Sequence, residues 1–448
     1  MFQLQIKKFL RTKAAVAALL ITFCIGLISI YTGKAFLLRQ YKAIDAAASY
    51  QQQHIERLIK YENKEFGLLL YYLKFTYVNK PLPLTAFSIG QRDVNSSIQA
   101  ISIRGLEAQK YDTDLQNPFN LMMGNVDLSF VILFIFPLLI ISLSFNLLSE
   151  EKENGTWRLI YTQTNSSVNY LLQKLFVAAL FTVGILFLLF VAGIIIIEIP
   201  VNRLLLQFAG VSLLYILFWY AAAFFIVSLN KNSGTNAVLM LSVWLLLTVL
   251  LPAAVNNFIS IRYPVPEALS TMLKQRDGYH RKWDLPKEKS LQQFYTAYPQ
   301  YKNYVWKQNG FDWLWYYAMQ HCGDLDAQPD RLRFMQKLEQ RNRASTIAAW
   351  FIPTVNLQMQ HNELSQASLS NYISFLDSTT AFHEKVRLRF YPKIFEAAPV
   401  LNEDWTKQKV VYHTAQQFTI SPISIISMLC FIVLLSAAAR YNCKQLLQ

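Results

Sequence analysis

The longest apolar runs of this sequence contain no Asp, Glu, Lys, Arg or His. Six such runs are present, at residues 14–33, 128–148, 175–197, 204–229, 237–259 and 420–439. A helix needs about 20 predominantly apolar residues to cross the hydrocarbon core of a bilayer. Uninterrupted apolar runs, rather than amphipathic periods, exclude an ordinary soluble core and predict six transmembrane helices.

The absence of charge within these runs also limits how transport could be energised. Ion-coupled transporters usually bury ionisable residues in the membrane, because the moving ion needs a titratable or liganding group along its path. Here only Asp127 and Glu198 lie near the ends of the runs. The sequence therefore argues against a secondary transporter and against a proton-driven motor.

A phosphate-binding loop is lacking as well. Such a loop reads GxxxxGK followed by Ser or Thr, so that backbone amides, the lysine and the hydroxyl hold phosphates and magnesium. The one Gly-Lys pair, Gly33 with Lys34, is followed by Ala35. We therefore expect that this chain is not an enzyme, needs no cofactor, and depends on another subunit for any ATP hydrolysis.

Cysteine and histidine give no sign of a disulfide or a metal centre. Of four cysteines only Cys322 is expected in an oxidising compartment, so it has no partner for an intramolecular disulfide there. The histidines all lie in polar segments, with spacings that fit no zinc or copper pattern. We expect them to be solvated surface residues. They are His54, His280, His321, His361, His383 and His413.

Two long polar segments, 34–126 and 260–419, separate the apolar runs and are too long to be turns. The formal net charge of +14 is spread along the chain, without the concentrated basic patch that would indicate nucleic-acid binding. Outside the polar segments, nearly all basic residues fall in the termini and in the loops after the second and fourth runs. These residues are Lys7, Lys8, Arg11, Lys13, Lys152, Arg158, Lys174, Lys231, Arg440 and Lys444. With six spans they share one side, which the positive-inside rule assigns to the cytosol.

These patterns predict a protein of the bacterial inner (cytoplasmic) membrane, with cytosolic termini and large extracytoplasmic loops. The first run is long enough to span and is followed by Lys34, Arg39 and Lys42, so it is expected to be a retained anchor rather than a cleaved signal peptide. The expected units are the cytosolic N-terminus with the first span (1–33), a first extracytoplasmic domain (34–126), a four-span block (127–259) with a cytosolic coupling segment (149–167), a second extracytoplasmic domain (260–419), and the last span with a cytosolic tail (420–448).

The expected fold class is an all-α polytopic membrane protein whose two insertions are mostly helical with a small extended portion. Residues 35–75 lack proline, so the first helix is expected to continue outward to about Phe75. Ile101 and Ile103 alternate with polar neighbours, as in a short strand. The aromatic run at 311–317 fits helix core packing, or else a platform for a lipid, a peptide or the membrane interface. Helix breaks in the second insertion are expected at Pro286, Pro299, Pro329, Pro353 and Pro392.

The segment after the second run combines charge with a helix break. Gly155 can end the charged helix in a left-handed conformation, and Thr156 can cap a short amphipathic helix that carries Trp157. Such a helix beneath the bilayer suits a groove on a cytosolic partner, although a plain interfacial helix has the same pattern. The candidate coupling residues are Glu150, Glu151, Lys152, Glu153, Gly155, Thr156 and Trp157.

Glu-x-Glu-x-Gly-Thr after a span, followed by an apolar helix, a Ser-rich turn and Lys174, resembles the coupling segment of type-2 ABC transporter permeases. Residues 86–93, 117–118, 124–127, 352–358 and 372–376 resemble a branch of that superfamily with enlarged external loops. The chain departs from the family pattern at Trp157, where leucine is usual, and at 365–367, where a glycine-containing turn is expected.

The resemblance implies a permease subunit that pairs with a second permease, identical or different, and is driven by a cytosolic ABC ATPase. It implies rigid-body rearrangement of the spans, and we expect an exporter. A charge-free bundle fits an apolar or amphipathic substrate, or a mechanical task. An alternative hypothesis is that the chain is a non-transporting membrane scaffold of an envelope or surface-secretion machine. Membrane lipid is an expected partner in either case, and nucleic acid in neither.

Overall fold

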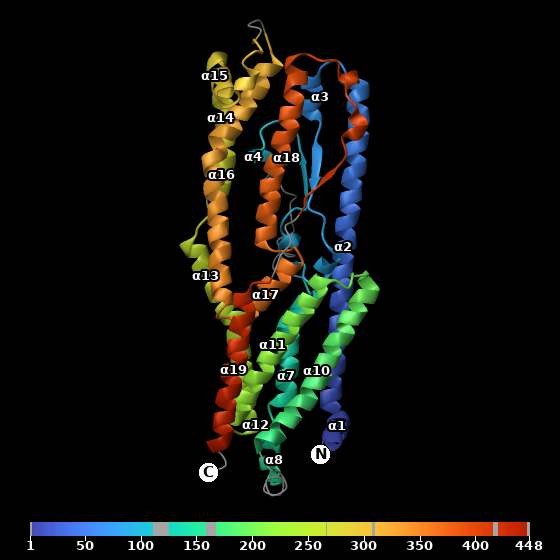
Figure 1. The fold of residues 1–448 in the computed structure, drawn as a ribbon, viewed down its shortest axis with the longest axis vertical. Coiled ribbons are helices and arrows are strands. Elements are labelled where there is room, and N and C mark those ends of the chain that lie inside the picture. Colours follow the sequence, from blue (N-terminus) through green and yellow to red (C-terminus); the bar gives the residue numbers. More distant parts are fainter. Residues whose placement is uncertain are drawn as a thin grey trace.

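The computed structural model describes residues 2–110, 125–157, 167–265, 267–306, 310–414 and 420–445. The molecule is elongated, with an apolar helical bundle in one half and a more polar domain in the other (Figure 1). Both termini lie at the free end of the bundle. We call the polar half the distal domain. It is built from the described residues between 34 and 110 and between 263 and 414.

Within the described residues, six helices are long and apolar enough to cross a membrane. They correspond one to one to the six apolar runs, which confirms a mostly helical protein with six candidate spans. Membrane insertion and the side on which each loop lies remain predictions. The candidate spans are Lys13–Tyr61, Leu128–Glu153, Val168–Ile197, Arg203–Ser228, Ser233–Arg262 and Pro422–Cys443.

The elements of the bundle follow the chain order closely. A short helix, α1 (Phe2–Arg11), precedes the first span, and the second and fifth spans each contain a π-helical segment. The elements are α2 (Lys13–Tyr61), α6 (Leu128–Phe130), η3 (Val131–Ile135), α7 (Phe136–Ser144), α8 (Ser149–Glu153), α10 (Ser167–Ile197), α11 (Arg203–Ser228), α12 (Ser233–Leu245), η4 (Leu246–Leu250), α13 (Leu251–Arg262) and α19 (Pro422–Gln445).

Each π-helical segment ends two residues before a proline, which explains its position. Pro137 has no backbone N–H, so the carbonyl of Leu133, four residues earlier, loses its helical partner. The hydroxyl of Tyr215 on α11 donates to that carbonyl at 3.0 Å. In an apolar bundle a freed carbonyl needs such a replacement, and here it joins the second span to the fourth.

The distal domain is mainly helical, with one small sheet. Its elements are α3 (Phe66–Tyr72), β1 (Phe75–Val78), η1 (Pro83–Ala86), η2 (Gly90–Asp93), β2 (Ile98–Ile101), α4 (Glu107–Lys110), α14 (Glu267–Asp284), α15 (Lys287–Ala297), η5 (Pro299–Tyr301), α16 (Trp313–Ala349), α17 (Pro353–Leu364), α18 (Leu369–Phe395), η6 (Val400–Asn402), η7 (Trp405–Lys407) and β3 (Val411–Tyr412).

The sheet joins the two polar segments into one domain. Its strand order is β2-β1-β3; β1 pairs antiparallel with β2, with Phe75 opposite Ile101, and parallel with β3, with Tyr77 opposite Val411. β1 and β2 come from the first polar segment and β3 from the second. One hydrophobic cluster likewise contains residues of both segments, from Ile55 to Trp405. The two segments therefore do not form separate domains.

Several expected helix boundaries in this domain are wrong. The first helix ends at Tyr61, and Phe75 begins a strand rather than ending the helix. Pro329 and Pro392 lie inside α16 and α18 instead of breaking them. For Pro392, the carbonyl of Leu388 that loses its N–H partner accepts the hydroxyl of Tyr301 at 3.4 Å, a long-range contact that local sequence does not reveal.

The aromatic run at 311–317 packs mostly inside the distal domain. Asp312 caps α16 by accepting the backbone N–H of Leu314, and Trp315 and Tyr317 are 1% and 0% exposed. Tyr317 donates to the carbonyl of Gly67 at 2.8 Å, which ties α16 to α3. Core packing is therefore the interpretation that the structure confirms, and only Phe311 remains largely exposed.

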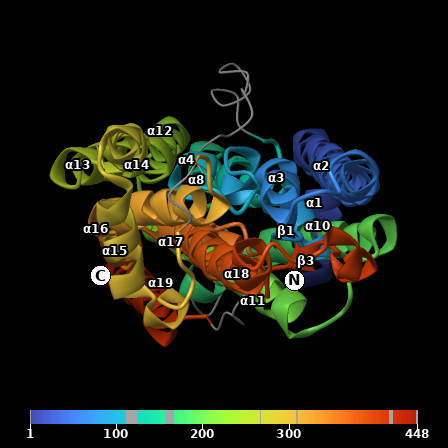
Figure 2. The ribbon, with the colours of Figure 1, turned by 90° about the horizontal axis from the view of Figure 1, so that it is seen from above.

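Helix α17 lies at the junction of the two halves, seated on the bundle (Figures 1 and 2). The hydroxyl of Thr354 donates to the carbonyl of Leu247 in the π-helical segment of the fifth span. The amide of Asn356 donates to the carbonyl of Ser424 at the start of α19. The turn after α17 has a left-handed residue, Gln366 with φ +53°, at the position where a glycine was expected. A segment expected wholly in the outer domain thus closes the distal end of the bundle.

Candidate functional site

At the end of the bundle where both termini lie, a buried polar cluster is centred on Glu151 of α8. Its carboxylate accepts the ammonium of Lys174 on α10 at 2.7 Å and that of Lys8 on α1 at 3.1 Å. It also accepts the hydroxyls of Thr156 at 2.7 Å and Tyr170 at 3.2 Å. The Glu151 side chain is only 9% exposed. We call these five residues the Glu151 cluster; it joins α8 and α10 to α1, which lies more than 130 residues earlier in the chain.

The neighbouring charges of α8 bind the loop after α11 and the first residue of α12. Lys152 donates to the side-chain oxygen of Asn230. The carboxylate of Glu153 accepts both the backbone N–H and the hydroxyl of Ser233 at 2.8 Å. Ser149 and Ser233 share a hydroxyl hydrogen bond of 2.7 Å. Segment 149–156 is therefore attached to the loop after the fourth span as well as to α1 and the third span.

Gly155 and Thr156 turn the chain directly after α8. Gly155 has φ +72°, a left-handed conformation that costs a residue with a Cβ about 1 kcal/mol or more. A Cβ there would meet nothing within 4 Å, so the constraint lies in the backbone and not in crowding. The Thr156 hydroxyl also lies 3.1 Å from the carbonyl of Glu151, which closes the turn back onto α8.

Trp157 is the last described residue before a gap at 158–166. Its ring is half-buried against the bundle core, 6.5 Å from the ring of Tyr170, and the ammonium of Lys152 lies 5.4 Å from its centroid. The amphipathic helix expected after Thr156 falls almost wholly on 158–166 and so lies outside the described residues. The next helix, α10, begins at Ser167, eight residues before the apolar run at 175–197.

All seven candidate coupling residues thus lie together at one end of the bundle, but they point in different directions. Glu151 is directed inward and is 7% exposed, whereas Glu153 is exposed and the partly exposed Glu150 accepts only Asn146 among the described residues. Sequence reasoning missed Lys8, Tyr170, Asn230 and Ser233. Only a lone polar residue at the start of an apolar helix, such as Tyr170, gave any signal of these partners.

A second buried polar site lies where α17 meets the bundle. His361 is fully buried, with its two ring nitrogens 2.8 Å from the hydroxyl of Ser129 and 3.0 Å from that of Ser212. Its ring stacks on Phe208 at 3.8 Å. The imidazole therefore joins α17 to the second and fourth spans.

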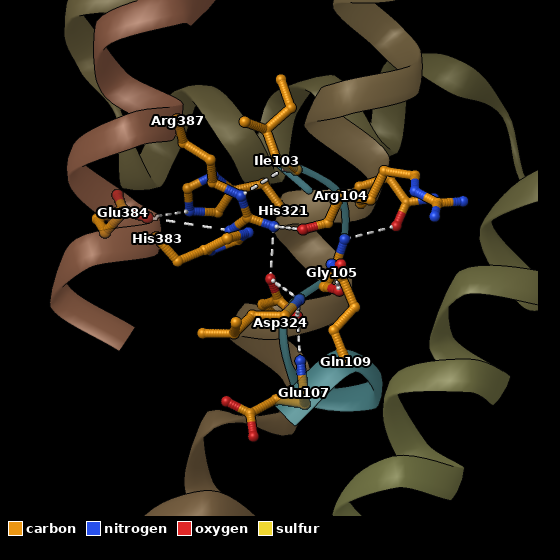
Figure 3. A network of polar contacts seen from close by, with 12 residues as sticks. Ile103, Arg104, Gly105, Glu107, Gln109, His321, Asp324, His383, Glu384 and Arg387 are labelled. Carbon is orange, nitrogen blue, oxygen red and sulfur yellow. Dashed lines mark hydrogen bonds and ion pairs between the residues drawn. The ribbon is translucent and has the colours of Figure 1, made fainter. Parts of the chain in front are cut away.

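A third polar network holds the centre of the distal domain together (Figure 3). Arg387 of α18 donates to the carbonyls of Ile103 and Arg104 at 3.1 and 2.9 Å and pairs with Asp324 of α16 at 2.5 Å. Asp324 in turn accepts the backbone N–H of Leu106 at 2.8 Å. The irregular segment after β2 is thereby fixed between α16 and α18.

Two buried histidines belong to this network. His383 binds the carbonyl of Ser102 at 3.0 Å, and His321 binds the hydroxyl of Tyr391 at 3.1 Å. Burial, reinforced by the charge of Arg387, lowers the pKa of both imidazoles well below the usual value. The expectation that all six histidines are solvated is therefore wrong for His321, His361 and His383, each at most 2% exposed.

No group of three or more His, Cys, Asp or Glu residues is placed to hold a metal ion in the part of the chain that the structure describes. The four cysteines are free, and Cys322 and Cys443 are buried. The three polar sites are therefore hydrogen-bonded connections between elements.

Comparison with known proteins identifies one domain. A domain of unknown function (DUF3526) matches residues 268–412, which lie in the distal domain. No curated protein and no solved structure matches the chain. The matched region covers less than half of the chain and does not include the bundle or the Glu151 cluster.

Proposed function

We propose that this chain is the membrane-spanning permease subunit of an ABC exporter, driven by a separate cytosolic ATPase. The observation that carries the proposal is the Glu151 cluster. It ties the segment after the second span to α1 and α10, while Lys152 and Glu153 tie it to the loop after α11. A force applied at this segment, which ends the second span, would reach the first, third, fourth and fifth spans through short, charge-assisted contacts.

The shape of the segment suits docking to a partner. α8 projects from the end of the bundle where both termini lie (Figure 1). The left-handed turn at Gly155 redirects the chain, and Trp157 follows directly. Aromatic residues beside charges are frequent anchors at protein interfaces. Because the loops at this end carry the basic residues, we assign it to the cytosol and the distal domain to the extracytoplasmic side of the bacterial inner membrane.

The burial of the candidate spans supports a second permease subunit. The most apolar windows of the second and fourth spans are 67% and 72% buried, whereas those of the fifth and sixth are only 11% and 17% buried. The fifth and sixth spans therefore present wide apolar faces to lipid or to another chain, as an identical or different partner permease would require.

The runner-up function is a non-transporting membrane scaffold, which the large, well-packed distal domain would also suit. Purification of the tagged full chain from its native membranes in mild detergent separates the two. We expect a stoichiometric ATP-binding-cassette ATPase, and hydrolysis that disappears when that subunit is removed. A preparation that contains other envelope components and no nucleotide-hydrolysing protein would contradict the transporter and favour the scaffold.

A further inference from the structure

A groove runs between α16 and α18, beside the junction of the distal domain and the bundle. Its volume is about 710 Å³, within the range of small-molecule sites. α16 descends towards α17 and α18 rises from it, so one end of the groove lies next to the candidate spans (Figure 1). The lining residues include Glu339, Arg343, Ile347 and Trp350 of α16 and its C-cap, with Ile373 and Asp377 of α18.

The lining changes from apolar to charged along the groove. Trp350 and Ile347 lie at the α17 end of α16, and Glu339 lies about 16 Å farther out at 1.5 Å per helical residue. On α18, Ile373 is nearer to α17 and Asp377 one turn farther away. The apolar part of the groove thus faces the bundle, and both signs of charge lie towards its outer end.

The hydroxyls of Thr346 and Ser370 are hydrogen-bonded, whereas the charged side chains of the groove and its indole have no strong partner in the part of the chain that the structure describes. Among the described residues, Glu339, Arg343 and Asp377 form no ion pair within 4 Å, and the buried indole N–H of Trp350 has no hydrogen-bond acceptor. Lys110, whose charge acts on Asp377, is itself engaged with Thr380 and Glu107. Two exposed carboxylates and one exposed guanidinium therefore line the groove without an ion pair to another described residue.

We propose that this groove binds the headgroup of an amine-bearing phospholipid from the leaflet on the distal side. Arg343 binds the phosphate, because guanidinium is a strong phosphate donor, and the N–H of Trp350, at the membrane end of the groove, binds an ester oxygen. Glu339 and Asp377 bind the ammonium. Ile347 and Ile373 contact the glycerol region and the first acyl carbons, and the chains continue into the membrane beside α17.

The order of the groups favours a lipid over a soluble ligand. A phospholipid in a bilayer has its apolar end towards the membrane and its ammonium outermost, which is the order found along the groove. A soluble aminophosphate would fill the charged end alone and would leave the indole and the two isoleucines unused. The inference needs the six helices to be in a bilayer but does not depend on an ATPase.

The test is lipid titration of the delipidated full chain in dodecyl maltoside, followed by native mass spectrometry. The probes are short-chain phosphatidylethanolamine, phosphatidylcholine and phosphatidylglycerol, with O-phosphoethanolamine as the headgroup alone. We expect one saturable phosphatidylethanolamine, bound about tenfold more tightly than the other lipids. A primary ammonium donates to carboxylates, whereas a quaternary one cannot and phosphatidylglycerol has none.

Substitutions of groove residues test whether the lipid binds there. Arg343→Gln and Asp377→Asn should each weaken phosphatidylethanolamine binding about tenfold, and Trp350→Phe, which keeps an aromatic ring but loses the N–H, about threefold. Arg333→Gln, at an exposed arginine earlier on α16 and outside the groove, should change nothing. Because Arg343 and Asp377 are exposed, their substitutions should leave the thermal melt unchanged.

Two results would overturn the proposal. Equal binding of all three lipids, or binding that none of the groove variants alters, would mean that only annular lipid is detected. Binding of O-phosphoethanolamine as tight as that of the lipid would indicate a soluble aminophosphate ligand and contradict the membrane source.

Discussion

Glu151 illustrates how burial changes the role of a charged residue. From the sequence, Glu151 is one of several charges on a protruding segment. Such charges could form the rim of a docking surface. In the structure it lies inside, in contact with Lys174, Lys8, Thr156 and Tyr170. A carboxylate with four donors fixes its neighbours in place, so we assign Glu151 a positioning role and leave direct docking to the exposed charges nearby.

Glu151→Gln should destabilise the end of the bundle where both termini lie. The amide keeps the shape but loses the charge, and Lys174, whose side chain is 10% exposed, is left without a counter-ion. Loss of one partner of a largely buried pair costs about 2 kcal/mol or more, equivalent to a melting temperature lower by about 4 °C. Thermal unfolding in detergent measures this. The control is Glu150→Gln, and equal shifts for the two variants would contradict the positioning role.

His321 and His383 should make the distal domain less stable in mild acid. Their pKa values are lowered in the folded protein, whereas the unfolded chain takes up protons near pH 6.5. The unfolded state therefore binds more protons below about pH 6.5. The free energy of unfolding should fall there by up to about 1.4 kcal/mol per pH unit for each histidine. The charged and titratable groups around them are Arg387, Glu384, Asp324, Tyr298 and Tyr391.

Hydrogen exchange of α18 peptides in the full chain, measured between about pH 7.5 and 5.5, reports this change after correction for intrinsic exchange rates. His383→Gln can still donate to the carbonyl of Ser102 but cannot titrate, so its pH dependence should be shallower. Burial raises the pKa of Glu107, so Glu107 also titrates, but it is present in both proteins. The difference between their pH profiles therefore reports His383 alone. The exposed His280→Gln is the control. Parallel profiles for His383→Gln and the unaltered chain would show that His383 does not contribute.

Among the elements, the spans could be predicted and the contacts of the distal domain could not. A charge-free run of about 20 residues can satisfy its backbone hydrogen bonds in a bilayer only as a helix, so local composition was enough to predict the candidate spans. Pro329 and Pro392 were expected to break helices, yet long α16 and α18 continue through them. The position of α17 was missed because Thr354, Asn356 and His361 look like ordinary polar residues until their partners on the spans are known.

The candidate site was predicted to the same limited extent. The charges and the glycine located the coupling segment, and the positive φ of Gly155 confirms the expected break. The direction of each side chain depends on contacts with residues up to 143 positions away, as for Lys8 and Glu151. Such contacts have no local signature. The glycine expected at 365–367 is replaced by a left-handed Gln366, which accepts Arg92 through its carbonyl at 2.8 Å.

Gly33→Ala should weaken the junction between the first span and the distal domain. A Cβ at Gly33 would lie 1.9 Å from the carbonyl oxygen of Ala86, and a backbone atom cannot move aside as a side chain can. Overpacking of this kind costs about 1–3 kcal/mol, which a lower midpoint of thermal unfolding should show. Gly184→Ala is the matched control, because a Cβ there meets nothing within 4 Å. No difference between the two variants would contradict the close approach.

For the whole molecule, the sheet and the hydrophobic cluster show that the two polar segments fold as one domain on one side of the bundle. The predicted sidedness can be tested by thiol labelling in intact spheroplasts, with Cys24 and Cys430 changed to Ala. Cys443 is 3% exposed and would be silent on either side, so introduced cysteines are needed. Leu401→Cys, at a position 70% exposed in the distal domain, should react with an impermeant reagent.

Lys231→Cys, at the exposed loop between α11 and α12, should react only after the membrane is permeabilised. Labelling of Lys231→Cys with silence at Leu401→Cys would invert the topology. It would also place the Glu151 cluster on the side that has no ATP.

The central claim is that segment 149–157 transmits the conformational change of an ATPase to the candidate spans. The most direct measurement is ATP hydrolysis by the purified complex of this chain with its ATPase in nanodiscs. Gly155→Val should insert and fold but redirect the chain after α8, and stimulated hydrolysis should fall by about fivefold, the scale of a 1 kcal/mol coupling energy. Gly184→Val, at a helical glycine where an added Cβ meets nothing within 4 Å, should hydrolyse ATP at the unaltered rate. If Gly155→Val and Trp157→Ala both keep full stimulation and full binding of the ATPase, the segment is only an interfacial turn and the claim is contradicted.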